Sequence, residues 1–201
     1  MYTIRRVVLA LSIGALPVYA LAQDKIGMFE MLYFSDNPAY GIEATEPGDF
    51  YVECASLDKL IKRGGVLIEA QNLEGFKEAL SAARDRFIEW SDVAKLNSVA
   101  ELDKEMEISS PSVKGYWFQG KWKFDYSQAL SYRFKILADG RHVLIINTGK
   151  LQAADNQFMD HDGMALVFTT AAEVDSLIAA LDPVRVKEYF EEKKKKGDLF
   201  R

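Results

Sequence analysis

The sequence predicts a two-layer α+β fold in which a mostly antiparallel sheet is covered by one long amphipathic helix and a C-terminal helix pair. Apolar residues recur every three or four positions over about Leu73–Lys95, which is the spacing of one helix face. Residues 129–149 form two apolar runs around Asp139-Gly140, the pattern of a β-hairpin. Two helix-start signals, Thr170-Ala-Ala-Glu173 and Asp182-Pro183, then lie near the end of the chain.

The elements before the long helix are less regular. Residues 23–34 alternate weakly, which favours a strand and leaves a helix open. The turn residues in 35–49 predict a loop. The remaining predictions are strands at 50–54 and 66–70, and a short helix at 57–62 that begins after Ser56 and ends at Gly64-Gly65.

The long helix carries the strongest periodic signal. Asn72 is a suitable N-cap and Glu74 lies in the first turn. The apolar positions are Leu73, Phe76, Leu80, Ala83, Phe87, Trp90 and Ala94. This stripe is typical of a helix that lies on a sheet, and the alternative is a coiled-coil seam between chains.

The second half of the chain reads as a β-region followed by helices. Residues 97–113 are ambiguous, with a short strand near Met106 and Ile108, and 116–126 alternate as extended backbone that Gln119-Gly120 can fold into a hairpin. A two-residue turn at Asp139-Gly140 pairs Ala138 with Arg141, Ile136 with Val143 and Phe134 with Ile145. Residues 164–168 read as a strand covered on both faces. Helices follow from Thr170 and from Asp182.

The two halves of the chain show a weak internal repeat. Val66–Leu80 and Ala165–Leu181 are both an apolar strand, a polar cap and an amphipathic helix. Duplication would produce this pattern, and so would the ordinary recurrence of strand followed by helix.

The N-terminus has the features of a secretory signal peptide. Arg5 and Arg6 precede an uncharged apolar stretch, and Ala20-Leu21-Ala22 forms a small-x-small cleavage site. We therefore predict a signal peptide over 1–22 and one α+β domain over 23–201. The alternative, an uncut membrane anchor, is disfavoured because the stretch is shorter than the roughly 20 residues of a spanning helix and contains Pro17. The expected location is the periplasm or the medium, with no stable membrane insertion after cleavage.

Charge disfavours two classes of partner. Removing residues 1–22, with two arginines and no acid, leaves 23 basic and 30 acidic residues, a net charge of −7. Nucleic acids and anionic membranes attract the opposite sign, so neither is an expected partner. The basic run Lys193–Lys196 is interpreted as the solvated end of a helix.

The residues that usually carry catalysis are scarce. The single cysteine, Cys54, lies in an apolar run and is interpreted as a buried hydrophobe rather than a nucleophile. His142 is interpreted as a strand residue beside a turn. No Gly-x-Ser-x-Gly, Ser-x-x-Lys or His-Glu-x-x-His motif occurs, so no catalytic residue and no cofactor is predicted.

The densest group of potential metal ligands is Asp155–Gly163, which includes Asp160, His161 and Asp162. Alternating oxygen ligands before a glycine are how calcium loops begin. The run has Phe158 where a third acid would stand and no downstream glutamate in 166–169. The segment is therefore interpreted as a polar turn, and no metal site is assigned.

Aromatic residues at even positions from Tyr116 to Tyr126 are interpreted as the core face of a sheet packed under the helix from Leu73, with a ligand platform as the alternative. Trp117 would then point outward, to a mixed face with Arg133 and Lys135. The function predicted on this basis is a soluble, non-enzymatic exported module that binds a protein or a small ligand. The alternatives are a secreted carboxylate-dependent hydrolase of glycan-type substrates and a metal-stabilised structural protein.

Overall fold

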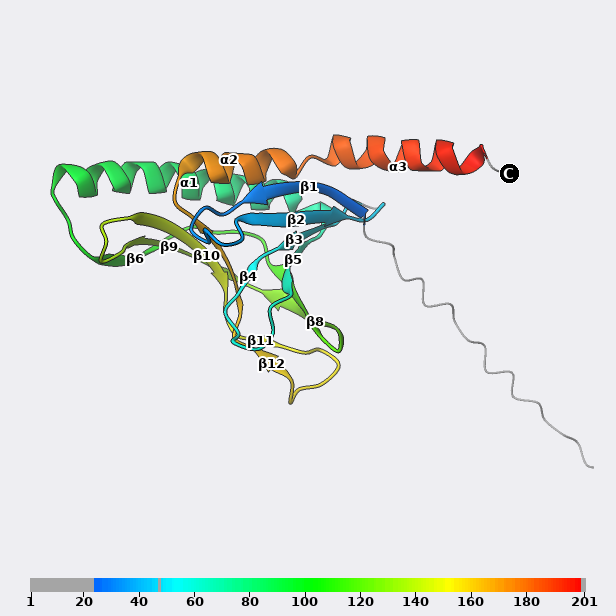
Figure 1. Cartoon of the computed structure of the whole chain (residues 1–201), viewed down its shortest axis with the longest axis horizontal. Coiled ribbons are helices and arrows are strands. Elements are labelled where there is room, and N and C mark those ends of the chain that lie inside the picture. Colours follow the sequence, from blue (N-terminus) through cyan, green and yellow to red (C-terminus); the bar gives the residue numbers. More distant parts are fainter. Residues whose placement is uncertain (1–23, 47, 200–201) are drawn as a thin grey trace, which may run out of the picture.

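The computed structural model describes residues 24–46 and 48–199, and the predicted signal peptide lies outside them. The described chain has an α+β fold in which helices and antiparallel sheets are combined (Figure 1). Three α-helices are present in this part of the chain: α1 (Leu73–Leu96), preceded by the 3-10 turn η1 (Ala70–Asn72), α2 (Ala171–Ala180) and α3 (Pro183–Asp198). The predicted fold class is confirmed.

The strands divide between two large sheets, where the sequence analysis expected one. The first sheet contains, in order, β1 (Asp24–Glu30), β2 (Ala39–Ala44), β3 (Phe50–Glu53), β5 (Gly64–Ile68), β7 (Val113–Gln119) and β8 (Lys121–Gln128). The second contains β4 (Ala55–Ser56), β13 (Met164–Phe168), β10 (His142–Thr148), β9 (Leu130–Ile136) and β6 (Leu102–Met106). A short ribbon joins β11 (Leu151–Gln152) to β12 (Asp160–His161).

The two halves of the chain repeat one order of elements. An antiparallel series β1-β2-β3-β5 is followed by α1, and an antiparallel series β6-β9-β10-β13 is followed by α2. Each helix contacts strands of the other half, because α1 contacts β9 and β10 while α2 contacts β1 as well as its own β13. This order is consistent with the weak internal repeat in the sequence. Because each helix packs on strands of the other half, the two halves are interlocked.

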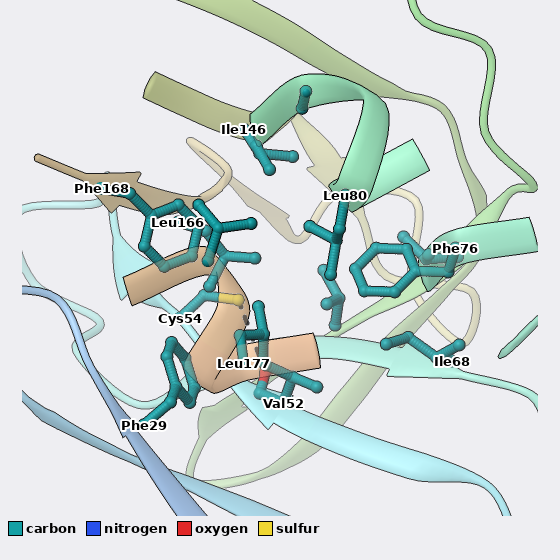
Figure 2. Packing of buried hydrophobic residues seen from close by; sticks show 14 of the residues in the cluster. Phe29, Val52, Cys54, Ile68, Phe76, Leu80, Ile146, Leu166, Phe168 and Leu177 are labelled. Atoms are coloured by element: carbon teal, nitrogen blue, oxygen red, sulfur yellow. Dashed lines mark hydrogen bonds between the residues drawn. The ribbon is translucent and has the colours of Figure 1, made fainter. Parts of the chain in front are cut away.

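One hydrophobic core lies where the helices and both sheets meet. Phe76 and Leu80 of α1 and Leu177 of α2 face Val52 and Ile68 of the first sheet. Figure 2 shows the second sheet closing this core with Ile146, Leu166 and Phe168. Each of these side chains is almost fully buried, so packing is the principal stabilising contribution.

Glu173 connects the beginning of α2 to the turn that follows β1. Its Oε2 accepts hydrogen bonds from the backbone N–H groups of Thr169 and Thr170, at 2.9 and 2.7 Å, and its Oε1 accepts from Leu32 at 2.6 Å. The Thr170 hydroxyl in turn caps the helix at the Glu173 N–H. This confirms the predicted capping box and explains how an almost fully buried carboxylate is satisfied.

Three local predictions are wrong. Residues 39–44 form a strand and not a loop, because the turn residues flank β2. Residues 57–62 form no helix, since the Asp58 carboxylate accepts from the Leu60 and Ile61 N–H groups and so stabilises a turn. Asn72 directly precedes α1 as predicted, but its Nδ2 donates to the Ser112 carbonyl and its side chain caps no helix N–H.

The helices lie along one side of the molecule and α3 extends beyond the strands (Figure 1). Asp182 caps α3 at the Val184 N–H and Pro183 occupies its first position, as predicted. Val186 is the buried residue of this helix. No helix of the described chain is both long and apolar enough to span a membrane.

Candidate functional site

The β7–β8 hairpin begins beside the start of α1, and β8 lies on the side of the molecule away from the helices (Figure 1). Phe118 pairs with Trp122 and Gln119 pairs with Lys121. Gly120 closes the turn at φ +73°, a conformation that glycine adopts without steric cost. The structure therefore contains the tight hairpin that the sequence left open, and β8 forms an edge of the first sheet.

The even-numbered aromatic residues of this hairpin form its outer face, which we call the aromatic face: Tyr116, Phe118, Trp122, Phe124 and Tyr126. Tyr116 is buried, with 6% exposure, and Phe124 is partly buried, whereas Trp122 is 41% exposed and Tyr126 63% exposed. The prediction that this face lies under α1 is wrong, since α1 packs instead on β9 and β10 of the second sheet. The alternative of an accessible platform describes the geometry better.

The rings of the aromatic face are held by one another and by neighbouring strands. Trp122 contacts Tyr116 at a centroid distance of 5.7 Å and Phe118 at 5.3 Å. Tyr51 of β3 supports Tyr116 edge-on at 5.3 Å. Phe124 and Tyr126 are nearly parallel, with centroids 6.4 Å apart and an 8° interplanar angle. Such contacts fix ring orientation before any ligand arrives.

Two cations border these rings. The Arg63 guanidinium carbon lies 5.1 Å from the Phe118 centroid and 5.4 Å from that of Trp122. Lys114 Nζ lies 5.8 Å from the Tyr126 centroid and 2.7 Å from Glu69 Oε1. Both positions are within cation–π reach. Sequence reasoning missed Arg63 and Tyr51, because strand pairing brings them to the hairpin from distant segments.

The sequence predicted that Trp117 points outward, and the structure shows that this prediction is wrong. Trp117 is fully buried, and its ring lies 5.7 Å from that of His161. The segment after β10 covers this inner face of the hairpin, and Leu151 occupies the space that a side chain at Gly115 would need. Arg133 and Lys135 lie in the other sheet, where both form ion pairs with Asp103 of β6. The predicted mixed face therefore does not exist as one surface.

The Asp155–Gly163 segment does not gather its potential ligands. Both Asp155 oxygens accept from Lys123 Nζ at 2.9 Å, and Lys121 binds the same carboxylate. These ammonium groups, Lys123 first, hold the pKa of Asp155 below its ordinary value. Asp160 pairs with Lys150, while His161 turns into the core. Within the described residues, no group of three or more His, Cys, Asp or Glu side chains is placed to hold a metal ion.

Ser56 and His161 approach each other in a way that superficially suggests a nucleophile and its base. His161 Nδ1 accepts from the Gly163 N–H at 3.0 Å, so the proton of the neutral ring is on Nε2. Nε2 then donates to Ser56 Oγ across 3.1 Å, and Ser56 donates to the Ile61 carbonyl. No lone pair of the imidazole faces the serine hydroxyl. The pair is thus a structural hydrogen bond between β4 and β12 rather than an activated nucleophile.

Cys54 is buried and its thiol donates to the Val52 carbonyl at 3.4 Å (Figure 2). Burial raises the pKa of this thiol far above its usual range, so little thiolate forms at neutral pH. The interpretation of Cys54 as a structural residue agrees with this geometry.

Comparisons with protein-family models, with curated proteins and with solved structures return no match. The candidate site therefore rests on the geometry of this chain alone.

Proposed function

We propose that this chain is an exported, soluble, non-enzymatic binding module that holds an extended glycan against the aromatic face. The observation that supports the proposal is the row of Trp122, Phe124 and Tyr126 on alternate residues of one edge strand. Alternate residues of a strand are roughly 6.6 Å apart. The rings thus form a series along β8 that suits a linear polymer, and Tyr126 lies where the β7–β8 register shifts.

The chemistry of the row favours a sugar chain. The face of an aromatic ring is electron-rich, and one side of a pyranose presents weakly positive C–H groups, so the two stack flat. Arg63, Lys114 and the Tyr126 hydroxyl supply polar groups for the sugar hydroxyls at the border of the face. Nucleic-acid bases also stack on aromatic rings, but the net charge of −7 that remains without residues 1–22 repels a polyanion.

The proposal is tested by affinity electrophoresis through a panel of soluble β-glucan, xylan, chitin oligomers and peptidoglycan fragments. We expect at least one glycan to retard the chain. Trp122→Ala should weaken binding about tenfold, which corresponds to roughly 1.4 kcal/mol for one lost stacking contact. Tyr126→Ala should act in the same direction.

Tyr189→Ala is the matched control, because Tyr189 is a partly exposed tyrosine on α3, far along the chain from β8. Equal binding by Trp122→Ala and the parent would contradict the proposal. If no glycan retards the chain and a protein cross-links to the aromatic face, the ligand would be a protein and not a glycan. Turnover of a retained glycan would favour the alternative of a carboxylate-dependent hydrolase.

Export is part of the proposal and rests on the residues before Gln23. A mass for the protein recovered from its natural host that corresponds to cleavage after Ala22 would support it. An intact N-terminus on protein recovered from the cytosol would contradict it.

A further inference from the structure

A cleft of about 460 Å³ lies in the second sheet's half of the molecule and uses no residue of the aromatic face. It is bordered by the C-terminal half of α1, the β9–β10 turn and the first residues of α2. Its lining combines an apolar part, Phe87 and Ile88, with polar side chains that include Ser91, Lys95 and Arg141.

Ser91 is the first indication of a ligand. Its side chain is on the buried side of α1 with 7% exposure, and its Oγ has no hydrogen-bond partner. Buried hydroxyl groups in folded proteins nearly always have a partner, because an unpaired one loses its bonds to water without replacement. Ser91 lies in the wall of the cleft, so rotation of its side chain would present this donor to an acceptor on a bound molecule.

Two cations indicate the charge of that acceptor. Lys95 follows Ser91 by one helical turn, and its nearest carboxylate, Asp92, is 3.8 Å away. Arg141 directly follows the hairpin turn, and its Nε–H donates a hydrogen bond to Asp139 Oδ2 at 2.7 Å. A guanidinium has five N–H donors, so further donors exist beyond this contact. Asp92 is the acid that lines the cleft, and each cation keeps N–H donors beyond its contact with Asp92 or Asp139.

His142 lies beside the same cations. It meets the Phe134 ring edge-on at 5.5 Å, and its pKa is lowered by burial and by the charge of Lys95. A neutral imidazole therefore lines the cleft at pH 7. The start of α2 adds little, since the Glu173 carboxylate already accepts from the N–H groups of Thr169 and Thr170.

We propose that this cleft binds a small monocarboxylate, with its apolar body on Phe87 and Ile88 and its carboxylate between Ser91, Lys95 and Arg141. A carboxylate accepts from a hydroxyl, an ammonium and a guanidinium at once. The apolar floor distinguishes such a molecule from inorganic phosphate, which has no apolar body to bury.

The sequence contains two histidines, so imidazole NMR signals report on the cleft directly. We expect benzoate to shift the His142 signals saturably at millimolar concentration and to raise the His142 pKa by offsetting Lys95. His161, buried against Trp117, is the internal control and should not move. Benzamide, which has the same ring without the charge, should bind at least tenfold more weakly, and so should phosphate.

Variants separate binding from a structural role. Ser91→Ala and Lys95→Gln should each weaken benzoate binding about fivefold. Ser91→Ala should also leave the free protein no less stable, because it removes an unpaired hydroxyl. Lys77→Gln, at the other end of α1, is the matched control and should bind benzoate like the parent. Equal shifts of both histidines, no shift of either, or phosphate binding as tight as benzoate binding would each overturn the proposal.

Discussion

The side chain of His161 makes the stability of the fold depend on pH. Burial lowers its pKa, so the unfolded chain binds a proton more readily than the folded chain below about pH 6.5. This contribution to stability is therefore fully present above the pKa of the unfolded state and is lost as the pH falls through the lower, folded-state pKa.

We accordingly predict that the urea midpoint falls between pH 7 and pH 5, and that His161→Asn flattens this decline. Asparagine preserves an acceptor near the position of Nδ1 for the Gly163 N–H while removing the titration. Because burial also lowers the pKa of His142, the comparison is made in a His142→Asn background. An unchanged pH dependence after His161→Asn would show that the His161 imidazole does not titrate in this range.

Single residues also show where sequence reasoning fails. The alternation of residues 116–126 is real, but alternation does not say which face is covered. Gln119, Lys121 and Lys123 made the odd face look solvated. In the structure Lys123 is 3% exposed because Asp155 pairs with it from a segment that looked like a plain loop. The covering segment joins the hairpin through long-range contacts, which local periodicity does not contain.

At the scale of elements, long periodic segments were predictable and registers were not. The range predicted for the long helix agrees with α1 within one residue, because its apolar stripe continues over the whole length of one helix. The two strands of the β9–β10 hairpin were predicted correctly, but their register was wrong by one residue, because Ile136 was expected to pair with Val143. Ile136 pairs with His142 and Phe134 with Leu144, so the connection is the three-residue loop 138–140.

This register decides the surroundings of His142. Residues that pair directly lie on the same face of a sheet. His142 thus shares the face of Ile136 and Phe134, which packs on α1, and so comes to line the cleft beside Lys95. Asp139-Gly140 is also the signature of a type I turn followed by a left-handed glycine, which a sequence alone does not separate from the two-residue turn.

The three-residue loop requires a positive φ at Gly140. Its φ is +81° and nothing lies within 4 Å of an added Cβ, so Gly140→Ala would be strained by backbone conformation alone. We predict a loss of about 1 kcal/mol in the free energy of unfolding, measured by urea denaturation.

Gly149→Ala is the matched control, because its Cβ would also meet open space and its φ is not positive. That variant should be neutral or slightly stabilising. Equal effects of the two substitutions would mean that the turn relaxes to accommodate alanine.

At the scale of the whole molecule, the chain is held together by exchange between its halves. β4 of the first half pairs with β13, and β5 pairs with β7 of the second half. The exchange of α1 and α2 adds two further connections. Neither half retains a complete core without the other, which is the physical basis for expecting one domain over 23–201.

We therefore predict that fragments 23–99 and 100–201 are each unfolded alone and regain the native amide spectrum when mixed. The division falls in the connection between α1 and β6, where it cuts no helix or strand. The intact chain should unfold in one calorimetric transition with equal van't Hoff and calorimetric enthalpies. A fragment 23–99 with dispersed signals of its own, or two separate transitions in the intact chain, would contradict the interlocked core. Because α1 would then be stable without β9 and β10, its apolar stripe would need another surface to cover it.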